Sequence, residues 1–120
     1  HQVLSELSQA IPLIAITNGN VDPDKIGIGQ YFQAILKAGP DGRAKPYSDM
    51  FLKAQQSLML PAHHILHVGD HLVTDVYGAK KNGFQACWFN DGEPNLYQHP
   101  KARVLPDIEI NQITELLTLV

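Results

Sequence analysis

The stretch that decides the fold is residues 65–83, ILHVGDHLVTDVYGAKKNG. Its first residues, Ile65 to Val68, form a short and mostly apolar run that predicts a buried strand ending at Gly69-Asp70. A helical pattern from Thr74 to Lys81 follows. Gly83 then stands just past the helix, where glycine often ends helices. The stretch therefore predicts a strand that feeds a helix through a Gly-Asp loop.

The same alternation of strand and helix extends outward in both directions. Apolar runs predict further strands over residues 13–16, 31–36, 84–89 and 106–110. Helical spacing predicts helices over residues 3–10, 50–58 with Ser48 as the cap, and 113–119 with Asn111 as the cap. Residues 90–105 are predicted to form a loop. Short apolar strands that alternate with amphipathic helices indicate a doubly wound α/β fold, in which helices cover both faces of a parallel sheet.

Composition limits the possible functions. The chain has 120 residues, 44% of them hydrophobic, and a net charge of -3. We expect residues 1–120 to form one domain or part of one, with no basic patch for nucleic acid or an anionic membrane. The single cysteine, Cys87, lies in an apolar run and is expected to be a buried thiol, as is typical of a cytoplasmic protein. The chain starts without Met, so we expect the natural N-terminus to lie upstream.

Polar residues follow three of the predicted strands at or near their ends. Thr17-Asn18-Gly19 follow the first strand, Lys45 lies in the loop after the second, and Asp70 with Asp75 follow the third. In parallel sheets, ligands bind at the carboxyl ends of the strands. We therefore expect these residues to converge on one site.

Each of these residue types suits a phosphate or a metal. A hydroxyl at Thr17 and the backbone N–H groups of Asn18 and Gly19 can surround phosphate oxygens. Lys45 is a compact positive charge on a long stem, which suits a phosphate in a neighbouring loop. Asp70 and Asp75 offer carboxylate oxygens, the ligands that Mg²⁺ prefers together with waters and phosphate.

Simpler interpretations remain open for each motif alone. Asn18-Gly19 between two apolar runs is also a common hairpin turn. Lys45 has the features of an ordinary solvated lysine, Asp70 those of a helix cap, and Asp75 those of a carboxylate placed for the helix dipole.

Two other patterns are set aside. Four histidines lie close together in the sequence and include a pair spaced four apart, which on a helix suits zinc: His63, His64, His67 and His71. However, His67 falls inside a predicted strand, whose geometry does not place it beside His71. Gly27-Ile28-Gly29 resembles part of a dinucleotide fingerprint, but Phe32 replaces its third glycine. Neither a zinc site nor a dinucleotide site is expected.

Taken in order, three runs resemble the second, third and fourth motifs of the haloacid dehalogenase superfamily of phosphatases. They are residues 13–19, Lys45-Pro46 with residues 49–51, and residues 68–70 with Asp75 and residues 78–79. The resemblance covers about residues 3 to 119. Residues 15–20, 38–43 and 85–88 look like the bacterial branch that dephosphorylates flavin mononucleotide and 5-amino-6-(5-phospho-D-ribitylamino)uracil in riboflavin synthesis.

The resemblance implies a magnesium-dependent phosphatase that acts on a small phosphorylated metabolite through an aspartyl-phosphate. Thr17 and Asn18 would hold the phosphoryl group, Lys45 would hold phosphate and nucleophile, Asp70 would bind magnesium, and Asp75 would support the metal or its waters. The superfamily takes its nucleophile and general acid from an Asp-x-Asp motif that precedes these runs. The one such pattern here, Asp22-Pro23-Asp24, follows the second motif and no apolar strand, so it is expected to be a loop.

The resemblance also implies that the first, central strand of the sheet and the cap domain are absent from these residues. That strand would lie between the strands predicted over residues 13–16 and 65–68. Two unpaired edges would then face each other and invite pairing. We expect the two strands to pair directly, another segment to fill the gap, or copies of the chain to associate. We also expect the 120 residues alone to lack phosphatase activity.

Two other classes of function fit some of the same residues. One is a phosphate-binding or regulatory module that does not catalyse a reaction. The other is a receiver-like phospho-acceptor, which also uses Asp, Thr and Lys at strand ends. In receivers the acidic residues come first along the chain, whereas here Thr17 and Lys45 precede Asp70. The receiver is therefore disfavoured, and the non-catalytic module stays as the alternative.

Overall fold

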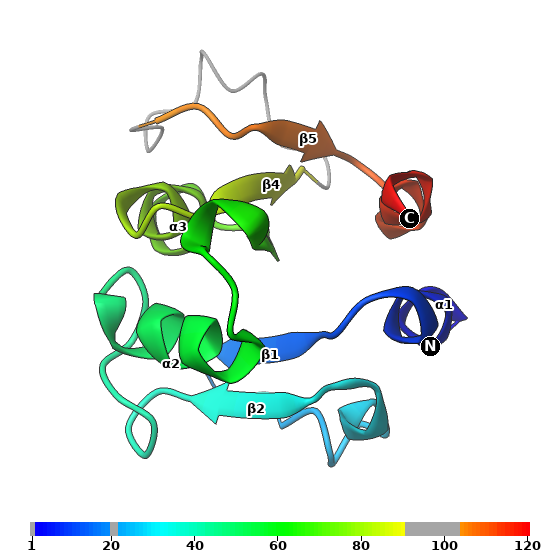
Figure 1. Ribbon diagram of the computed structural model, residues 1–120, viewed down its shortest axis with the longest axis horizontal. Coiled ribbons are helices and arrows are strands. Elements are labelled where there is room, and N and C mark those ends of the chain that lie inside the picture. Colours follow the sequence, from blue (N-terminus) through cyan, green and yellow to red (C-terminus); the bar gives the residue numbers. More distant parts are fainter. Residues whose placement is uncertain (1, 20–21, 91–103) are drawn as a thin grey trace.

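The computed structural model describes residues 2–19, 22–90 and 104–120, and the loop predicted over residues 90–105 lies mostly outside them. The strands form two separate parallel sheets (Figure 1). The first sheet pairs β1 (Ile14–Thr17) with β2 (Ala34–Lys37), and Ile14 lies opposite Ala34. The second has the order β3 (Leu66–Gly69), β4 (Gln85–Phe89), β5 (Ile108–Ile110).

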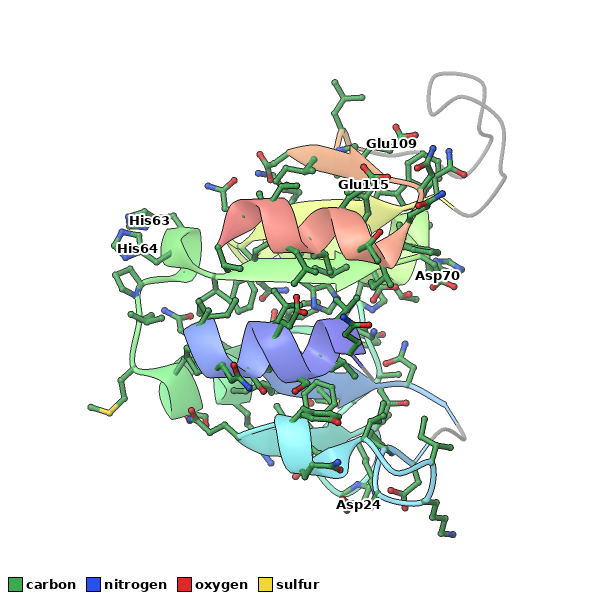
Figure 2. The ribbon with its side chains drawn as sticks, turned by 90° about the vertical axis from the view of Figure 1, so that its right-hand side faces the viewer. Asp24, His63, His64, Asp70, Glu109 and Glu115 are labelled. Atoms are coloured by element: carbon green, nitrogen blue, oxygen red, sulfur yellow. The ribbon has the colours of Figure 1, made fainter. Side chains whose placement is uncertain are left out.

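Helices cover both faces of these sheets. The helices α1 (Gln2–Ala10) and η5 (Ile113–Leu119) lie side by side on one face (Figures 1 and 2). On the other face lie α2 (Ser48–Leu58), the π-helical turn η3 (Leu72–Tyr77) and α3 (Gly78–Lys81). Two short 3₁₀ turns, η1 (Gly29–Tyr31) and η2 (Ala62–His64), join the rest. The predicted doubly wound α/β class is confirmed. No helix among the described residues is long and apolar enough to cross a membrane.

Strand β4 shows why both faces need a cover. Its successive side chains alternate between the faces, as in any strand. Ala86 and Trp88 are buried in the cluster beneath η3 and α3, while Cys87 is buried in the cluster beneath α1 and η5. Burial raises the pKa of the Cys87 thiol to about 11. The prediction of a buried thiol is therefore confirmed.

Helix α2 contributes to two clusters at once. Its residues Met50 and Ala54 pack with Leu36 of β2. Its residue Phe51 is fully buried in the cluster that contains Trp88 of β4. The same helix therefore lies against both sheets.

Several predicted boundaries are wrong. The strand predicted over residues 31–36 begins only at Ala34, because Tyr31 still belongs to η1. The cap position of α2 is Tyr47, not Ser48, and Tyr47 makes no side-chain cap bond. The cap of η5 is Gln112 rather than Asn111, and Gln112 forms a capping box with Glu115. Gly83 does follow the end of α3, with a φ of 83°.

A groove separates the two sheets. Strand β1 pairs only with β2 and strand β3 only with β4, so their facing edges are unpaired in the described residues. The expected direct pairing of β1 with β3 is wrong, and no described segment fills the space. A groove of about 320 Å³ remains, lined by residues of α1, β1, β3 and η5 that include Leu7, Ile14, Val68 and Leu116.

Candidate active site

Asn18 joins the loop after β1 to the loop before α2. Its side-chain Oδ1 accepts a hydrogen bond of 2.6 Å from the backbone N–H of Lys45. Its Nδ2 donates one of 3.0 Å to the backbone carbonyl of Lys45. One amide side chain thus satisfies both backbone groups of the lysine. Asn18 therefore fixes the position of Lys45.

The ammonium group of Lys45 reaches from the first sheet to the second. Its Nζ lies 2.5 Å from Oδ1 of Asp75 and 3.4 Å from the backbone carbonyl of Ile16. Only 10% of the Lys45 side chain and 7% of the Asp75 side chain are exposed. A buried charge is tolerated when it is paired and hydrogen-bonded, and both conditions hold here.

Asp75 has protein partners on both of its oxygens. Besides Lys45, Oδ1 lies 2.9 Å from Nε2 of His67. The backbone N–H of His71 donates a 3.1 Å bond to Oδ2. Burial alone would raise the pKa of Asp75, but the hydrogen bond to His67 and the charge of Lys45 outweigh burial and hold that pKa well below its usual range.

Gly69 leaves the space that Asp75 needs. A Cβ atom at position 69 would lie 2.2 Å from Cγ of Asp75, far inside normal contact. The last residue of β3 must therefore be glycine for the carboxylate to fold back against the strand. The Gly-Asp loop that ends β3 thus also makes room for Asp75.

Asp70 differs sharply from Asp75. It is exposed and follows the carboxyl end of β3, whereas His63 and His64 lie before the start of that strand, on the opposite side of the view in Figure 2. Its backbone carbonyl accepts a 3.2 Å bond from Nε1 of Trp88, which is buried. Its carboxylate makes no hydrogen bond or ion pair with any other described residue. The main chain of Asp70 is held while its side chain stays available.

The simpler interpretations of the acidic pair do not hold. The cap of η3 is His71, whose Nδ1 accepts bonds of 3.1 Å from the backbone N–H groups of Val73 and Thr74. Asp70 is therefore not the helix cap. Asp75 does lie in the first turn of η3, but it is buried in an ion pair rather than exposed to the helix end. Lys45 likewise is not a solvated lysine.

Thr17 and Gly19 lie where β1 ends. The backbone N–H of Gly19 donates a 3.2 Å bond to Oγ1 of Thr17, which tightens the loop. Because β1 and β2 are parallel, Asn18-Gly19 cannot be a hairpin turn, and that alternative is wrong. The structure thus links Asn18, Lys45 and Asp75 directly. Thr17 and Asp70 lie at the carboxyl ends of β1 and β3, and their side chains make no hydrogen bond or ion pair with those three.

The chemistry of the donor groups fits a magnesium ion at Asp70. Magnesium is usually held by one or two carboxylates, with waters and substrate phosphate completing its shell. Asp70 supplies one free, exposed carboxylate at a strand end. Within the described ranges no group of three or more His, Cys, Asp or Glu side chains is placed to hold a metal by itself, so waters and substrate phosphate would have to complete the shell. Asp75 has both oxygens occupied by protein.

Sequence reasoning missed the role of His67. The spacing of the histidines indicates at most a zinc ligand, whereas the structure makes His67 the third partner of the Lys45–Asp75 pair. A signal was present, because a histidine inside an apolar strand needs a buried partner. The loop at Asp22-Pro23-Asp24 was expected correctly: Asp22 accepts from the Asp24 backbone and pairs with Lys37.

Known proteins resemble this chain in sequence. The sequence pattern of the haloacid dehalogenase-like hydrolases matches residues 1–83. The chain is 47% identical over 120 residues to the 5-amino-6-(5-phospho-D-ribitylamino)uracil phosphatase YigB of Escherichia coli K12. The matched region covers all of this chain and 50% of the relative. The chain thus spans about half the length of this relative.

Solved structures share the fold. A 2-haloacid dehalogenase from Pseudomonas syringae pv. Tomato DC3000 superimposes with a TM-score of 0.88 and 33% identity, covering 99% of this chain and 50% of that one. The putative hydrolase YfnB from Bacillus subtilis, solved with magnesium bound, gives a TM-score of 0.84 and 28% identity, covering 98% and 53%. The family pattern spans more than half of the chain, and the chain belongs to the haloacid dehalogenase-like hydrolase family.

Proposed function

We propose that this chain forms the phosphate- and magnesium-binding part of a phosphomonoester hydrolase that acts through an aspartyl-phosphate. The observation that carries the proposal is the buried Lys45–Asp75 pair, with Asn18 clamping the lysine backbone. This network unites three sequence motifs at one edge of the two sheets. The identity of 47% to a phosphatase supports the same reaction class.

Each residue has a distinct task in the proposed reaction. Thr17 and the backbone N–H groups after β1 would bind the oxygens of the phosphoryl group. Lys45 would neutralise their growing negative charge. Asp70 would hold magnesium, which supplies Lewis-acid stabilisation of that charge when bound. Asp75 would not touch the substrate but would hold Lys45 in position through their ion pair.

The attacking carboxylate would come from a segment outside these 120 residues. Its oxygen would bond to phosphorus as the bond from phosphorus to the ester oxygen breaks, and a second carboxylic acid of that segment would give its proton to the departing alcohol oxygen. Water would then attack the aspartyl-phosphate and lose a proton to that second carboxylate, which releases inorganic phosphate and restores both carboxyl groups. The groove between β1 and β3 supports this arrangement, because a strand there would end beside Thr17 and Asp70.

The substrate we propose is flavin mononucleotide or another phosphate of riboflavin synthesis, and we place the protein in the cytoplasm. The name of the E. coli relative supports 5-amino-6-(5-phospho-D-ribitylamino)uracil as a substrate. Flavin mononucleotide rests on the resemblance described in the sequence analysis. The similar dehalogenase shows that this fold also serves a different reaction. A 2-haloacid also carries a negative charge, on its carboxylate, so Lys45 alone suits both reactions. The free carboxylate of Asp70, which can hold magnesium beside a phosphate, favours the phosphatase.

The direct test uses the full gene product with magnesium and measures phosphate release from flavin mononucleotide and from 5-amino-6-(5-phospho-D-ribitylamino)uracil. We expect turnover that falls about 10²-fold or more in Lys45→Met and in Asp70→Asn, since each removes a group that stabilises transition-state charge. Lys53→Met is the matched control, because Lys53 is a half-exposed surface lysine. Release of halide from 2-haloacids without phosphate release would overturn the proposal.

The alternative is a phosphate-binding module without catalysis. It predicts that the full gene product binds inorganic phosphate through Lys45 yet turns over no phosphomonoester.

Under the proposed function, we expect the 120 residues alone to bind phosphate without turnover. Light scattering should show that they self-associate through the open edges of β1 and β3. Turnover by the 120 residues alone, above the level of their Asp70→Ala variant, would contradict the need for an outside nucleophile.

A further inference from the structure

His67 is a largely buried titratable residue that the proposed reaction leaves without a task. It lies in β3 with 11% of its side chain exposed. Of the described residues that line the groove between the sheets, His67 is the single polar one. Its Nε2 lies 2.9 Å from Oδ1 of Asp75.

The ring of His67 is held in place by packing. The edge of Phe51 from α2 meets it with ring centroids 5.1 Å apart and planes at 78°. Phe51 in turn packs against Phe84 in the same edge-on manner, at 5.4 Å. An aromatic contact of this kind fixes ring orientation. Nε2 is therefore aimed at the carboxylate rather than free to rotate.

The oxygen that His67 contacts is the same one that holds Lys45. Oδ1 of Asp75 lies 2.5 Å from Nζ of Lys45 and 2.9 Å from Nε2 of His67. Oδ2 has the backbone N–H of His71. Without His67, Lys45 would be the only side chain compensating Asp75, and its ammonium would be drawn toward the carboxylate and away from a phosphate.

We propose that His67 is a positioning residue for Lys45, acting through Oδ1 of Asp75. This inference deepens the proposed function, because it concerns the lysine that would hold the phosphate. His67 donates its Nε2 proton to Asp75 and touches neither phosphate nor metal. Its task is to share the negative charge of Asp75, so that the lysine stays at the strand end.

The test compares His67→Gln with His67→Leu in the full gene product. Glutamine can place an N–H at the position of Nε2, whereas leucine fills similar space without a donor. We expect His67→Leu to weaken binding of inorganic phosphate about tenfold, as for loss of one charge-assisted hydrogen bond, and His67→Gln to retain most of it. If His67→Leu does not fold, His67→Met takes its place, because methionine adapts to irregular spaces.

A double-mutant cycle separates positioning from general structural damage. Once Lys45→Met has removed the lysine, His67→Leu should no longer affect phosphate binding, because its effect passes through Lys45. An undiminished tenfold loss in that background would overturn the inference. So would equal binding by His67→Leu and the wild type.

A second readout needs no phosphate and keeps the inference separate from the proposed function. The ammonium signal of Lys45, observed by NMR in protein with ¹⁵N-labelled lysine, should shift in His67→Leu and stay close to its wild-type position in His67→Gln. A shift of this kind without any phosphate binding would sink the proposed function and spare the inference. An unchanged Lys45 signal in His67→Leu would refute the inference alone.

Discussion

Asp70 and Asp75 lie five positions apart around the same loop, yet their surroundings are opposite. Only 7% of the Asp75 side chain is exposed and both of its oxygens have partners, whereas Asp70 is exposed and its carboxylate makes no hydrogen bond or ion pair with another described residue. Removing one partner of a buried ion pair is strongly destabilising, because the other charge is left uncompensated. An exposed carboxylate remains free for a ligand. The two aspartates of one motif thus divide stability and binding between them.

The largest expected effect is the loss of stability when the buried aspartate, Asp75, is removed. Asp75→Ala should lower the free energy of unfolding by about 3 to 5 kcal/mol, because it leaves Lys45 buried without its counter-charge. Asp70→Ala should change it by less than about 0.5 kcal/mol, as for most exposed positions. Urea denaturation of the two variants beside the wild type measures the difference. Equal losses in both variants would show that the aspartates are not divided in this way.

A smaller effect tests the space behind Asp75. Gly69→Ala would place a Cβ 2.2 Å from Cγ of Asp75, so the carboxylate must move. We expect a loss of about 1 to 3 kcal/mol, the usual cost of overpacking. Gly19→Ala is the matched control, because its Cβ would meet no atom within 4 Å. Denaturation curves that coincide for both alanine variants would mean that Asp75 does not need this space.

The smallest expected effect is the loss of Asp75's contribution to the free energy of unfolding at acidic pH. The pKa of Asp75 is lowered in the folded chain, whereas in the unfolded chain it stays near its ordinary value of about 3.9. The ionised form therefore contributes its full stability above that pH, and the contribution falls as pH drops toward the folded pKa. Each pH unit in that window removes up to about 1.4 kcal/mol.

The measurement compares unfolding of the wild type with that of Asp75→Asn from neutral to strongly acidic pH. The stability advantage of the wild type over Asp75→Asn should shrink as pH falls below the ordinary aspartate range. A constant advantage over Asp75→Asn down to the lowest pH would argue against a lowered pKa in the folded chain.

The sequence was sufficient to predict the parallel α/β fold and the placement of site residues at strand ends. Apolar runs locate the strands, because a strand that is covered by helices on both faces needs apolar side chains on both. The bounds predicted for β3 are each within one residue of those in the structure. The division of roles between Asp70 and Asp75 was not visible, because it depends on tertiary contacts with Lys45 and His67 from distant positions. The loop link made by Asn18 was hidden for the same reason.

Local signals also failed where tertiary packing decides. Ser48 is a good cap by type, yet the chain enters α2 at Tyr47 without a side-chain cap bond. The π-helical turn η3 has no sequence signature, and it arises where Asp75 must fold back against Gly69. The expectation that β1 pairs with β3 considers only the unpaired backbone groups at the two strand edges. It leaves out the side chains that line the groove between these strands.

Helix α2 packs against both sheets and should couple their opening. Met50 and Ala54 fasten it to the first sheet, and Phe51 fastens it to the second. Neither sheet can therefore open by itself without exposing one side of this helix to water. Amide hydrogen exchange should find the α2 backbone among the slowest-exchanging parts of the chain, with both sheets released in a single opening event.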